Sequence, residues 1–262
     1  MRISVLVPSL NSGGFIQEAI QSALAQDPPP HQVLVQDGGS TDDTLKVLEN
    51  FHDEVDVRSE PDRGQSEALN RAVARASGDV LVWLNADDLL APGAFAAVLA
   101  AFEQNPGAEF VYGDFNIVDG KGQTLRQFRS SAYDPQRVFV HGCYIFSGAI
   151  FFRRELIERV GPFDESLQAC MDFDYLMRIG RAKAVHVERT VARFRMSGQQ
   201  KSTGIRSRFI RESHSIRWRS AGGSVRLRLL TLGLDVRDAV YWITQPLRMT
   251  RAWGVLRRTR QL

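Results

Sequence analysis

Apolar positions in the first 113 residues follow two alternating periods. Short apolar runs, typical of buried strands, cover residues 3–7, 32–36, 55–59, 80–84 and 110–112. Between these runs, apolar residues recur at helical spacing over residues 15–24, 45–51, 66–76 and 95–102. Strands that alternate with helices through short connections form a parallel sheet. The pattern therefore predicts a three-layer α/β/α fold, with helices on both faces of the sheet.

The pattern changes after residue 113. Residues 115–118 and 124–128 flank an Asp-Gly-Lys-Gly turn and predict a β-hairpin. We expect further strands at residues 146–152 and 184–194, and short helices at residues 154–160 and 172–179. We predict one α/β domain over residues 1–204 and a helical extension over residues 205–262.

Charge is distributed unevenly along the 262 residues. Residues 205–262 contain 13 Arg, no Lys and three acidic residues, so they carry +10. Because the whole chain carries +3, the first 204 residues carry −7. A basic tail on an acidic body indicates contact with an anionic surface.

Cysteine usage and hydropathy indicate the compartment. The two cysteines, Cys143 and Cys170, lie far apart and fit no metal spacing, which favours a reducing environment. The first predicted strand ends at Pro8 and is too short for a secretory signal. Apolar runs stay well below the ~18 residues that a membrane span needs. We therefore expect a cytoplasmic protein.

Two adjacent carboxylates follow the apolar run 80–84, in the tetrad Asn85-Ala86-Asp87-Asp88. Ligands of open α/β sheets bind at the carboxyl ends of strands. Paired carboxylates there are costly unless a cation neutralises them, and a divalent metal that carries phosphate prefers oxygen ligands. A solvated loop with a helix cap would explain one Asp but not both, so the pattern favours a metal site for Mn²⁺ or Mg²⁺.

Polar residues also follow three other predicted strands. The segments are VPSLN (7–11), DGGSTD (37–42) and DRGQSEALN (62–70). Glycines there let a ligand approach the backbone, although each segment alone would also suit a turn and a helix cap. A Gly-x-Gly-x-x-Gly sequence does not follow the first strand, which disfavours a dinucleotide-binding domain.

In this order and spacing, the segments resemble those of the family 2 glycosyltransferases, which have the GT-A fold. The remaining matches are GD (78–79), NADD (85–88), GPFDE (161–165) and MDFDYLMR (171–178). Each segment is weak evidence, but the ordered series over about residues 1–204 is specific. The resemblance implies a nucleotide-sugar-binding half at residues 1–113 and an acceptor and catalytic half at residues 114–204.

The resemblance also implies roles for individual residues. Asp37 would recognise the nucleotide base, Asp87 would contact the ribose, Asp88 would bind the metal and Asp172 would be the catalytic base. Further contacts with the donor are expected from Pro8, Ser9, Asn11, Gly64 and Asn70. A metal at Asp88 would stabilise the leaving diphosphate as a Lewis acid.

The implied reaction is the inverting transfer of a sugar from a nucleotide diphosphate donor, with a UDP-sugar expected. The acceptor would be a saccharide or a lipid-linked molecule in bacterial surface polysaccharide or cell-wall assembly. Asp172 would take a proton from the acceptor hydroxyl, and a single displacement would invert the anomeric carbon. Asp174 is a rival for the base, and a carboxylate at a helix N-terminus would alone explain Asp172.

The sequence departs from the family pattern at three positions. Asn85 and Gly38 stand where the family usually has Asp, and Ser197 stands where it often has a metal-binding His. Arg195 or Lys201 would then supply positive charge to the diphosphate. The small residues Ser147 and Gly148 would leave room on the acceptor side, or simply pack as a strand.

Three alternatives remain open from the sequence. A scaffold that binds nucleotide-sugars without transferring them would fit Asn85 and Ser197. A nucleotidyltransferase would need a basic loop after the first strand, but residues 9–14 contain no Lys or Arg. The tail, with Leu and aromatic residues opposite Arg, would dock peripherally on the anionic cytoplasmic leaflet, or pack on the domain or a second subunit. No nucleic-acid-binding module accompanies its Arg residues.

Overall fold

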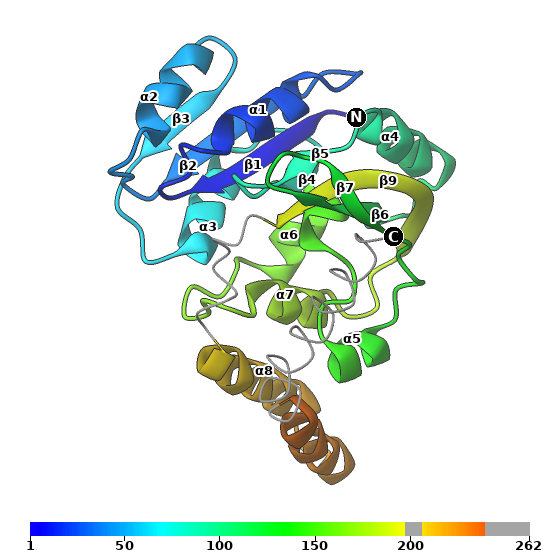
Figure 1. The fold of residues 1–262 in the computed structure, drawn as a ribbon. Helices are drawn as coiled ribbons and strands as arrows, with labels where there is room; N and C mark the ends of the chain where they lie inside the picture. Colours follow the sequence, from blue (N-terminus) through cyan, green and yellow to red (C-terminus); the bar gives the residue numbers. More distant parts are fainter. Residues whose placement is uncertain (197–205, 239–262) are drawn as a thin grey trace, which may run out of the picture. The chain divides into compact units, whose positions relative to one another are not determined.

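The computed structural model describes residues 1–196 and 206–238 (Figure 1). Contacts divide the chain into two units, Met1–Gln200 and Lys201–Leu262. The first unit contains one nine-stranded sheet with the order β3-β2-β1-β4-β8-β6-β9-β5, and β7 pairs with β6. Each unit is considered by itself below.

The first four strands are parallel and lie in the order β3-β2-β1-β4, as the alternating pattern predicts. These strands are β1 (Ile3–Ser9), β2 (Gln32–Asp37), β3 (Asp56–Ser59) and β4 (Val80–Trp83). They are joined by α1 (Ile16–Leu24), α2 (Thr44–Leu48) with η1 (Glu49–Phe51), and α3 (Gln65–Arg75). Their carboxyl ends share one edge of the sheet, where the polar segments lie.

The rest of the sheet is mixed rather than parallel. β8 (Ile150–Arg153) lies antiparallel between β4 and β6 (Phe110–Asp119), and β9 (Ala184–Met196) runs parallel to β6. The expected strand at 110–112 and the first arm of the hairpin form one continuous strand, β6. Two short strands complete the sheet, β5 (Leu89–Leu90) and β7 (Thr124–Phe128). Because β8 is antiparallel to both neighbours, β6 runs in the same direction as β4, as expected for the strands of residues 1–113.

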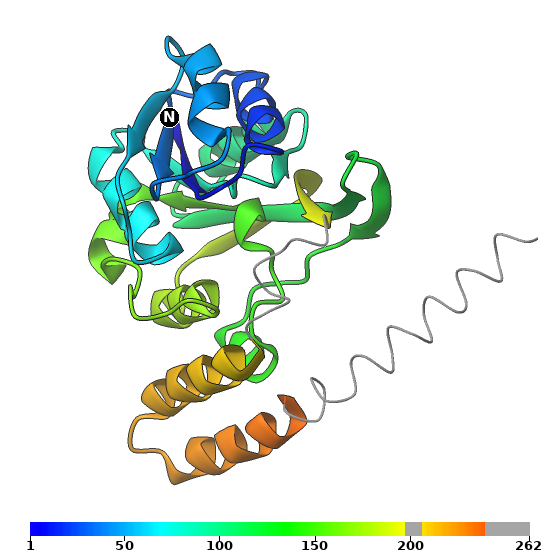
Figure 2. The same ribbon diagram turned by 60° about the vertical axis from the view of Figure 1, so that its left-hand side comes forward.

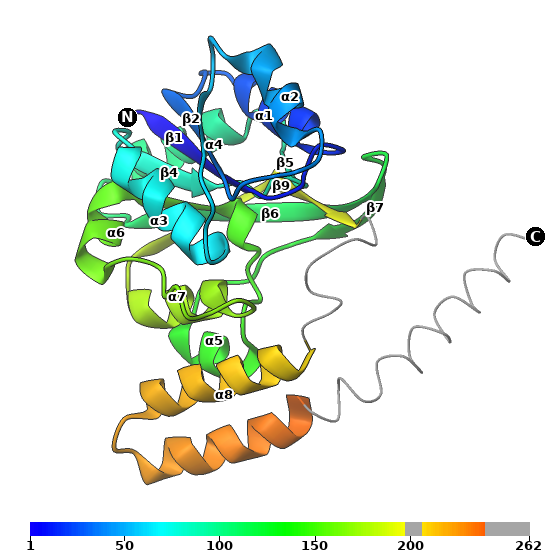
Figure 3. The ribbon, with the colours of Figure 1, turned by 90° about the vertical axis from the view of Figure 1, so that its left-hand side faces the viewer.

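Helices cover both faces of this sheet, as predicted (Figure 3). α1, α2 and α4 (Ala94–Gln104) lie over one face, and α3, α6 and α7 lie over the other. The remaining helices of the unit are α5 (Pro135–His141), η2 (Ser147–Ala149), α6 (Arg154–Val160) and α7 (Met171–Ile179). α7 carries Asp172 in its first turn, toward the edge of the sheet where the polar segments lie.

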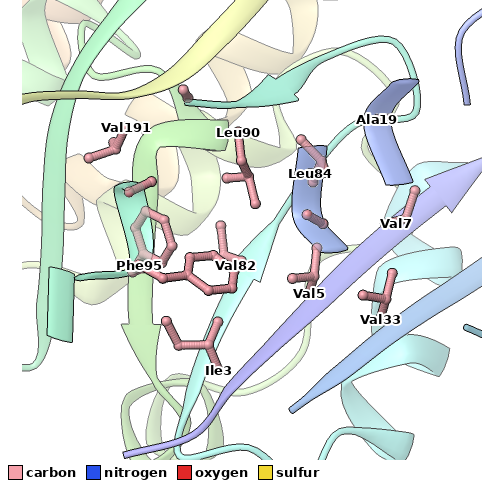
Figure 4. Packing of buried hydrophobic residues seen from close by; sticks show 14 of the residues in the cluster. Ile3, Val5, Val7, Ala19, Val33, Val82, Leu84, Leu90, Phe95 and Val191 are labelled. Carbon is pink, nitrogen blue, oxygen red and sulfur yellow. The ribbon is translucent and has the colours of Figure 1, made fainter. Parts of the chain in front are cut away.

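The main core lies between the sheet and the helices α1 and α4. Alternate residues of β1, namely Ile3, Val5 and Val7, point into it together with Val82 and Phe95 (Figure 4). Strands in a sheet that is covered on both faces are apolar at nearly every position, which explains their unbroken hydrophobic runs. The ring of Phe95 meets that of Phe151 edge-on, with the centroids 6.1 Å apart.

The described part of the second unit is a helical hairpin. It consists of α8 (Arg206–Ala221) and a helix over residues 225–238, which lie side by side in Figure 2. Ion pairs cross between them, from His214 to Asp235 at 2.6 Å and from Arg217 to Asp238 at 2.8 Å. Within residues 1–196 and 206–238, no helix combines the length and hydropathy of a bilayer span. The amphipathic pattern expected further along, at residues 239–262, lies outside the described residues.

Replacement of Phe95 by Ala should lower the free energy of unfolding by about 3–5 kcal/mol, because the fully buried ring would leave a cavity in the main core. Urea denaturation followed by circular dichroism measures this difference. The control is Leu125→Ala, whose side chain is 60% exposed on β7, and its effect should stay within about 0.5 kcal/mol. Equal destabilisation by both variants would contradict the assigned core.

Candidate active site

The polar segments gather at the carboxyl ends of β1, β2 and β4. Ser9 ends β1 and pairs in register with Asp37, which ends β2, and Asp37 pairs with Ser59 on β3. Asn85 to Asp88 follow β4 on the same edge. Strand register therefore brings Ser9 and Asp37 together, and the loop after β4 carries Asp87 and Asp88 on the same edge.

Asp37 is fully buried, and both oxygens of its carboxylate accept hydrogen bonds from other groups of the protein. Oδ2 accepts hydrogen bonds from the backbone N–H of Gly39 and Ser40 and from the Ser59 hydroxyl, at 3.0, 2.9 and 2.7 Å. Oδ1 accepts one from the Ser40 hydroxyl at 2.5 Å. This set of bonds shapes the turn after β2. The carboxylate that the resemblance assigns to the base thus already has four partners.

Asp62, which received no role from the sequence, lies directly against Gly38. A Cβ atom on Gly38 would come within 2.7 Å of Asp62 Oδ2, so glycine is needed there for the carboxylate to fit. Its other oxygen accepts the Gly64 N–H at 2.9 Å, and burial raises the pKa of the carboxyl group. The sequence offered one indication of Asp62. Gly38 stands where the family commonly has Asp, and the missing side chain leaves space for another carboxylate.

The residues at the end of β1 have different environments. Pro8 is buried in the strand, and the buried hydroxyl of Ser9 has no hydrogen-bond partner among the described residues. Asn11 has a left-handed backbone with φ of 49°. Its Oδ1 accepts the Thr41 N–H at 2.9 Å, and its N–H donates to the Ser40 hydroxyl at 2.7 Å. Asn11 therefore holds the turn after β2 in place.

Gly64 and Asn70 both serve the packing of neighbouring segments. Gly64 has φ of 138°, and the Gln168 amide lies where a Cβ would be. The Asn70 amide donates to the Phe163 carbonyl and to Glu165, and accepts the Phe163 N–H at 2.8 Å. All of these bonds join α3 to the GPFDE segment. Asn70 thus joins two segments of the fold, and its contact with the donor stays a prediction.

Asn85 is held by three hydrogen bonds at the end of β4. Its Oδ1 accepts the indole N–H of Trp83 at 2.6 Å and the Gln65 amide at 2.7 Å. Its Nδ2 donates to Asp88 Oδ2 at 2.7 Å. An Asp at this position would oppose the Asp88 charge, whereas the amide binds it. Asn85 therefore orders the loop, and its oxygen is already used within the protein.

Asp88 is almost completely buried, with 1% of its surface exposed. Oδ1 accepts the backbone N–H of Arg195 at 3.0 Å, and Oδ2 accepts the Asn85 amide. Burial, followed by the neighbouring Asp87 charge, raises the pKa of Asp88 to about 7. Asp88 thus couples the end of β9 to the loop after β4.

Asp87 is the more accessible of the two carboxylates. It is half-buried, and no side chain of the described residues donates a hydrogen bond to it. Burial raises the pKa of its carboxyl group, while Arg195 acts in the opposite direction. Clusters of three or more metal-ligand side chains do not occur in residues 1–196 and 206–238.

The Arg195 guanidinium is buried and bonded to the protein. It donates to the carbonyls of Asp87 and Gly120 at 3.0 and 2.8 Å and forms an ion pair with Glu18 at 2.7 Å. It also lies over the ring of Phe15. These contacts fix Arg195 against the loop after β4, and its contact with a phosphate stays a prediction. Ser197 and the other expected cation, Lys201, lie outside the described residues.

Asp172 lies in the first turn of α7, next to a thiol. Its Oδ1 accepts the Phe173 N–H at 2.8 Å, and the Cys143 side chain hydrogen-bonds the carboxylate. Burial raises the pKa of the Asp172 carboxyl group, which brings it closer to the range of a general base at neutral pH. Burial, followed by Asp172, holds the pKa of Cys143 well above its usual range. Cys143 is therefore a neutral donor.

The rival carboxylate, Asp174, points elsewhere. It is buried with 4% exposure and forms an ion pair with Arg178 at 2.7 Å along α7. Asp172 instead lines a cavity of about 10 Å³, which is the size of one water molecule. Trp83 and Ser147 also line this cavity. Trp83 therefore reaches both the cavity beside the candidate base and, through its hydrogen bond to Asn85, the loop that carries Asp87.

Family and sequence comparisons agree with this geometry. Residues 4–161 match the model of glycosyl transferase family 2. A PGL/p-HBAD biosynthesis glycosyltransferase of Mycobacterium bovis is 31% identical over 182 residues, which cover 67% of this chain and 68% of that protein. An uncharacterized glycosyltransferase of Rickettsia conorii is 26% identical over 203 residues, covering 72% of this chain. The chain spans about a third of the length of that relative, since the match covers 33% of it.

Solved structures share the fold at low sequence identity. S. aureus TarS in complex with UDP-GlcNAc has a TM-score of 0.70 at 17% identity, covering 91% of this chain and 72% of that chain. The mannosyltransferase PcManGT from Pyrobaculum calidifontis, in complex with GDP-Man and Mn²⁺, has a TM-score of 0.63 at 20% identity, covering 97% and 80%. Both neighbours are GT-A glycosyltransferases. By its matched family model and this fold, the chain belongs to glycosyltransferase family 2.

Proposed function

We propose that this protein is an inverting glycosyltransferase that moves a sugar from a nucleotide diphosphate, with a UDP-sugar as the donor, to a saccharide or lipid-linked acceptor. The observation that carries the proposal is the shared side chain of Trp83. Its ring lines the cavity beside Asp172, and its N–H holds Asn85, two residues before Asp87. This arrangement supports a general base at Asp172 and a metal-binding carboxylate at Asp87 on one edge of the sheet.

The metal in this proposal is Mn²⁺ or Mg²⁺, and its protein ligand is Asp87. Both cations prefer oxygen ligands, and Mg²⁺ usually keeps water and binds through one or two carboxylates plus substrate phosphates. Asp87 fits because its carboxylate has no side-chain donor among the described residues, whereas both oxygens of Asp88 accept hydrogen bonds. Asp88 then positions the loop. The resemblance implied Asp88 as the metal ligand, and we assign the metal to Asp87 instead. The contact of Asp87 with the ribose stays a prediction.

Recognition of the base is assigned to Asp62, with Pro8 and Ser9 beside it. Asp37 has four donors of its own, whereas Asp62 Oδ2 lies next to Gly38 at the carboxyl end of β2. A carboxylate there can accept the N–H of uracil. The partnerless hydroxyl of Ser9 offers a further hydrogen bond to the nucleotide.

The transfer step needs only one base. An acceptor hydroxyl beside Asp172 would give its proton to the carboxylate as the hydroxyl oxygen attacks the anomeric carbon. The bond from that carbon to the diphosphate would break on the opposite face, so the configuration inverts. A divalent cation, when bound, would neutralise the charge that develops on the diphosphate. Cys143 and the Phe173 N–H hold the carboxylate in position for this proton transfer.

The setting that we propose is bacterial cell-envelope assembly. The M. bovis relative is named for PGL/p-HBAD biosynthesis, and a structural neighbour contains UDP-GlcNAc. We further propose that the basic extension docks the enzyme on the anionic inner face of the plasma membrane, next to lipid-linked acceptors. The scaffold reading stays an alternative, but Asn85 no longer favours it, since its amide has an ordering role.

Metal binding can be tested by thermal stability with UDP and GDP, each with and without Mn²⁺. A ligand at a hundredfold excess over its dissociation constant stabilises the folded state by about 2.7 kcal/mol. Asp87→Asn should remove the part of this shift that depends on Mn²⁺, because the variant loses the charged ligand. Asp53→Asn, at an 84% exposed side chain, is the matched control and should behave like the wild type. A shift that survives in Asp87→Asn but is lost in a folded Asp88→Asn would return the metal to Asp88.

Asp62→Ala should weaken nucleotide binding by about tenfold or more, since it removes a charged hydrogen-bond acceptor. Isothermal titration with UDP measures the change. Asp37→Ala serves as the comparison, and it should mainly lower the thermal stability because four internal donors lose their acceptor. Normal binding by Asp62→Ala, together with lost binding by a folded Asp37→Ala, would assign the base to Asp37.

Asp172→Asn should reduce the release of UDP from the UDP-sugar by about 10²–10⁴-fold, because an amide cannot accept the proton. The thermal shift caused by the donor should stay unchanged, since Asp172 does not bind the nucleotide. Asp174→Asn should instead lower the thermal stability through loss of its ion pair. Undiminished turnover by Asp172→Asn would refute the assigned base. A donor that binds the wild type and is never hydrolysed or transferred would support the scaffold.

A further inference from the structure

The helix over residues 225–238 has two opposite faces with different surroundings. One face meets α8, where Asp235 and Asp238 form ion pairs and Thr231 and Leu234 are buried. The other face carries the row Val225, Leu229, Leu232 and Val236, with 69%, 65%, 49% and 65% of their surfaces exposed. At 100° per residue, this row lies within an arc of about 60° on the side away from α8.

A row of exposed aliphatic side chains at this spacing is a binding surface rather than a random feature. Single exposed apolar residues are common, but contiguous ones mark sites of interaction. One apolar face, the one that meets α8, would be enough to keep residues 225–238 helical in the hairpin. The second apolar face therefore needs a separate explanation.

Positive charge flanks the row on both sides. On the same helical projection, the exposed Arg226 and Arg237 lie about 100° to one side of it and the exposed Arg228 lies about 70° to the other. Arg228 also stacks over the ring of Trp218, 5.0 Å from the centroid, and Trp218 is itself 37% exposed. A helix face with an apolar row between Arg residues is complementary to a surface that has an apolar interior and anionic groups on its outside.

The acidic residues of the described hairpin offset only part of this charge. Residues 206–238 contain eight Arg and three acidic residues. Glu212 is buried, and Asp235 and Asp238 are paired with His214 and Arg217 across the hairpin. Asp238 also forms an ion pair with Arg237 at 2.7 Å, which leaves Arg226 and Arg228 as the main positive charges beside the row. The Arg residues on both flanks would repel a second copy of the same face.

We propose that the row Val225, Leu229, Leu232 and Val236 inserts into an anionic lipid surface, while Arg226 and Arg228 bind its headgroup phosphates. A helix with an apolar face between basic flanks lies in the plane of the interface and inserts its apolar side chains by several ångströms. Basic side chains near an anionic surface strengthen such binding. The inference rests on the membrane docking proposed above and deepens it by naming the face that docks.

Flotation of the full-length chain with vesicles tests this assignment. The wild type should float with vesicles of equal parts phosphatidylcholine and phosphatidylglycerol at low salt, and much less with phosphatidylcholine alone. The double variant Leu229→Gln/Val236→Gln should lower the partition coefficient by about tenfold or more, because two inserted side chains become polar. Gln retains good helix propensity, so the helix should remain. The matched control is Leu125→Gln, at a 60% exposed Leu in the other unit, and it should float like the wild type.

A second double variant tests the contribution of the Arg residues to membrane binding. Arg226→Gln/Arg228→Gln should lower the partition coefficient about tenfold or more and reduce its dependence on salt. Flotation of the Leu229→Gln/Val236→Gln variant like the wild type would overturn the proposal. So would a wild type that ignores anionic vesicles and elutes as a dimer that the same variant converts to a monomer, since the row would then be a contact between copies.

The flotation result tests the docking face independently of the transferase proposal. Flotation needs no donor, and the thermal shift with UDP and Mn²⁺ needs no vesicle. A variant that loses flotation but keeps the thermal shift would support the docking face in a folded protein. A wild type that floats without any nucleotide shift would contradict the transferase and leave the docking face in place.

Discussion

The buried contact between Asp88 and Arg195 is the constraint on which the proposed site depends. The Arg195 N–H holds Asp88, and its guanidinium binds the Asp87 carbonyl, the Gly120 carbonyl and Glu18. Breaking one partner of a buried charged network is costly, because the other charge stays buried without compensation. The contact therefore fixes the loop after β4 against the end of β9 and leaves Asp87 as the accessible carboxylate.

The mixed sheet explains how two halves of the chain form one site. Parallel strands β1, β2 and β4 bring their carboxyl ends to one edge, as ligand sites of open α/β sheets require. β8 pairs antiparallel with β4 and so places η2 and α7 next to that edge. Trp83, in the first half, meets the ring of Phe163 edge-on and lines the cavity at Asp172, both in the second half. The position of the proposed base relative to Asp87 therefore depends on the whole fold.

Departures from the family pattern are compensated locally. The absence of a side chain at Gly38 makes space for Asp62, so a carboxylate remains at the end of β2. The amide of Asn85 donates to Asp88 where a second carboxylate would repel it. Such replacements keep the balance of charge and hydrogen bonds in the site. They favour a retained function over a decayed one.

The sequence alone determined the family, the first four strands and the residues that gather at their ends, because hydrophobic periodicity and ordered motifs are local properties. It also indicated the basic extension. Only the tertiary structure decided which oxygens remain available. The partner of Asp88 lies 107 residues away at Arg195, and the partners of Asn70 lie at the GPFDE segment. Hydrogen bonds between such distant residues depend on the folded sheet, and so do the roles of Asp62, Asp87 and Arg195.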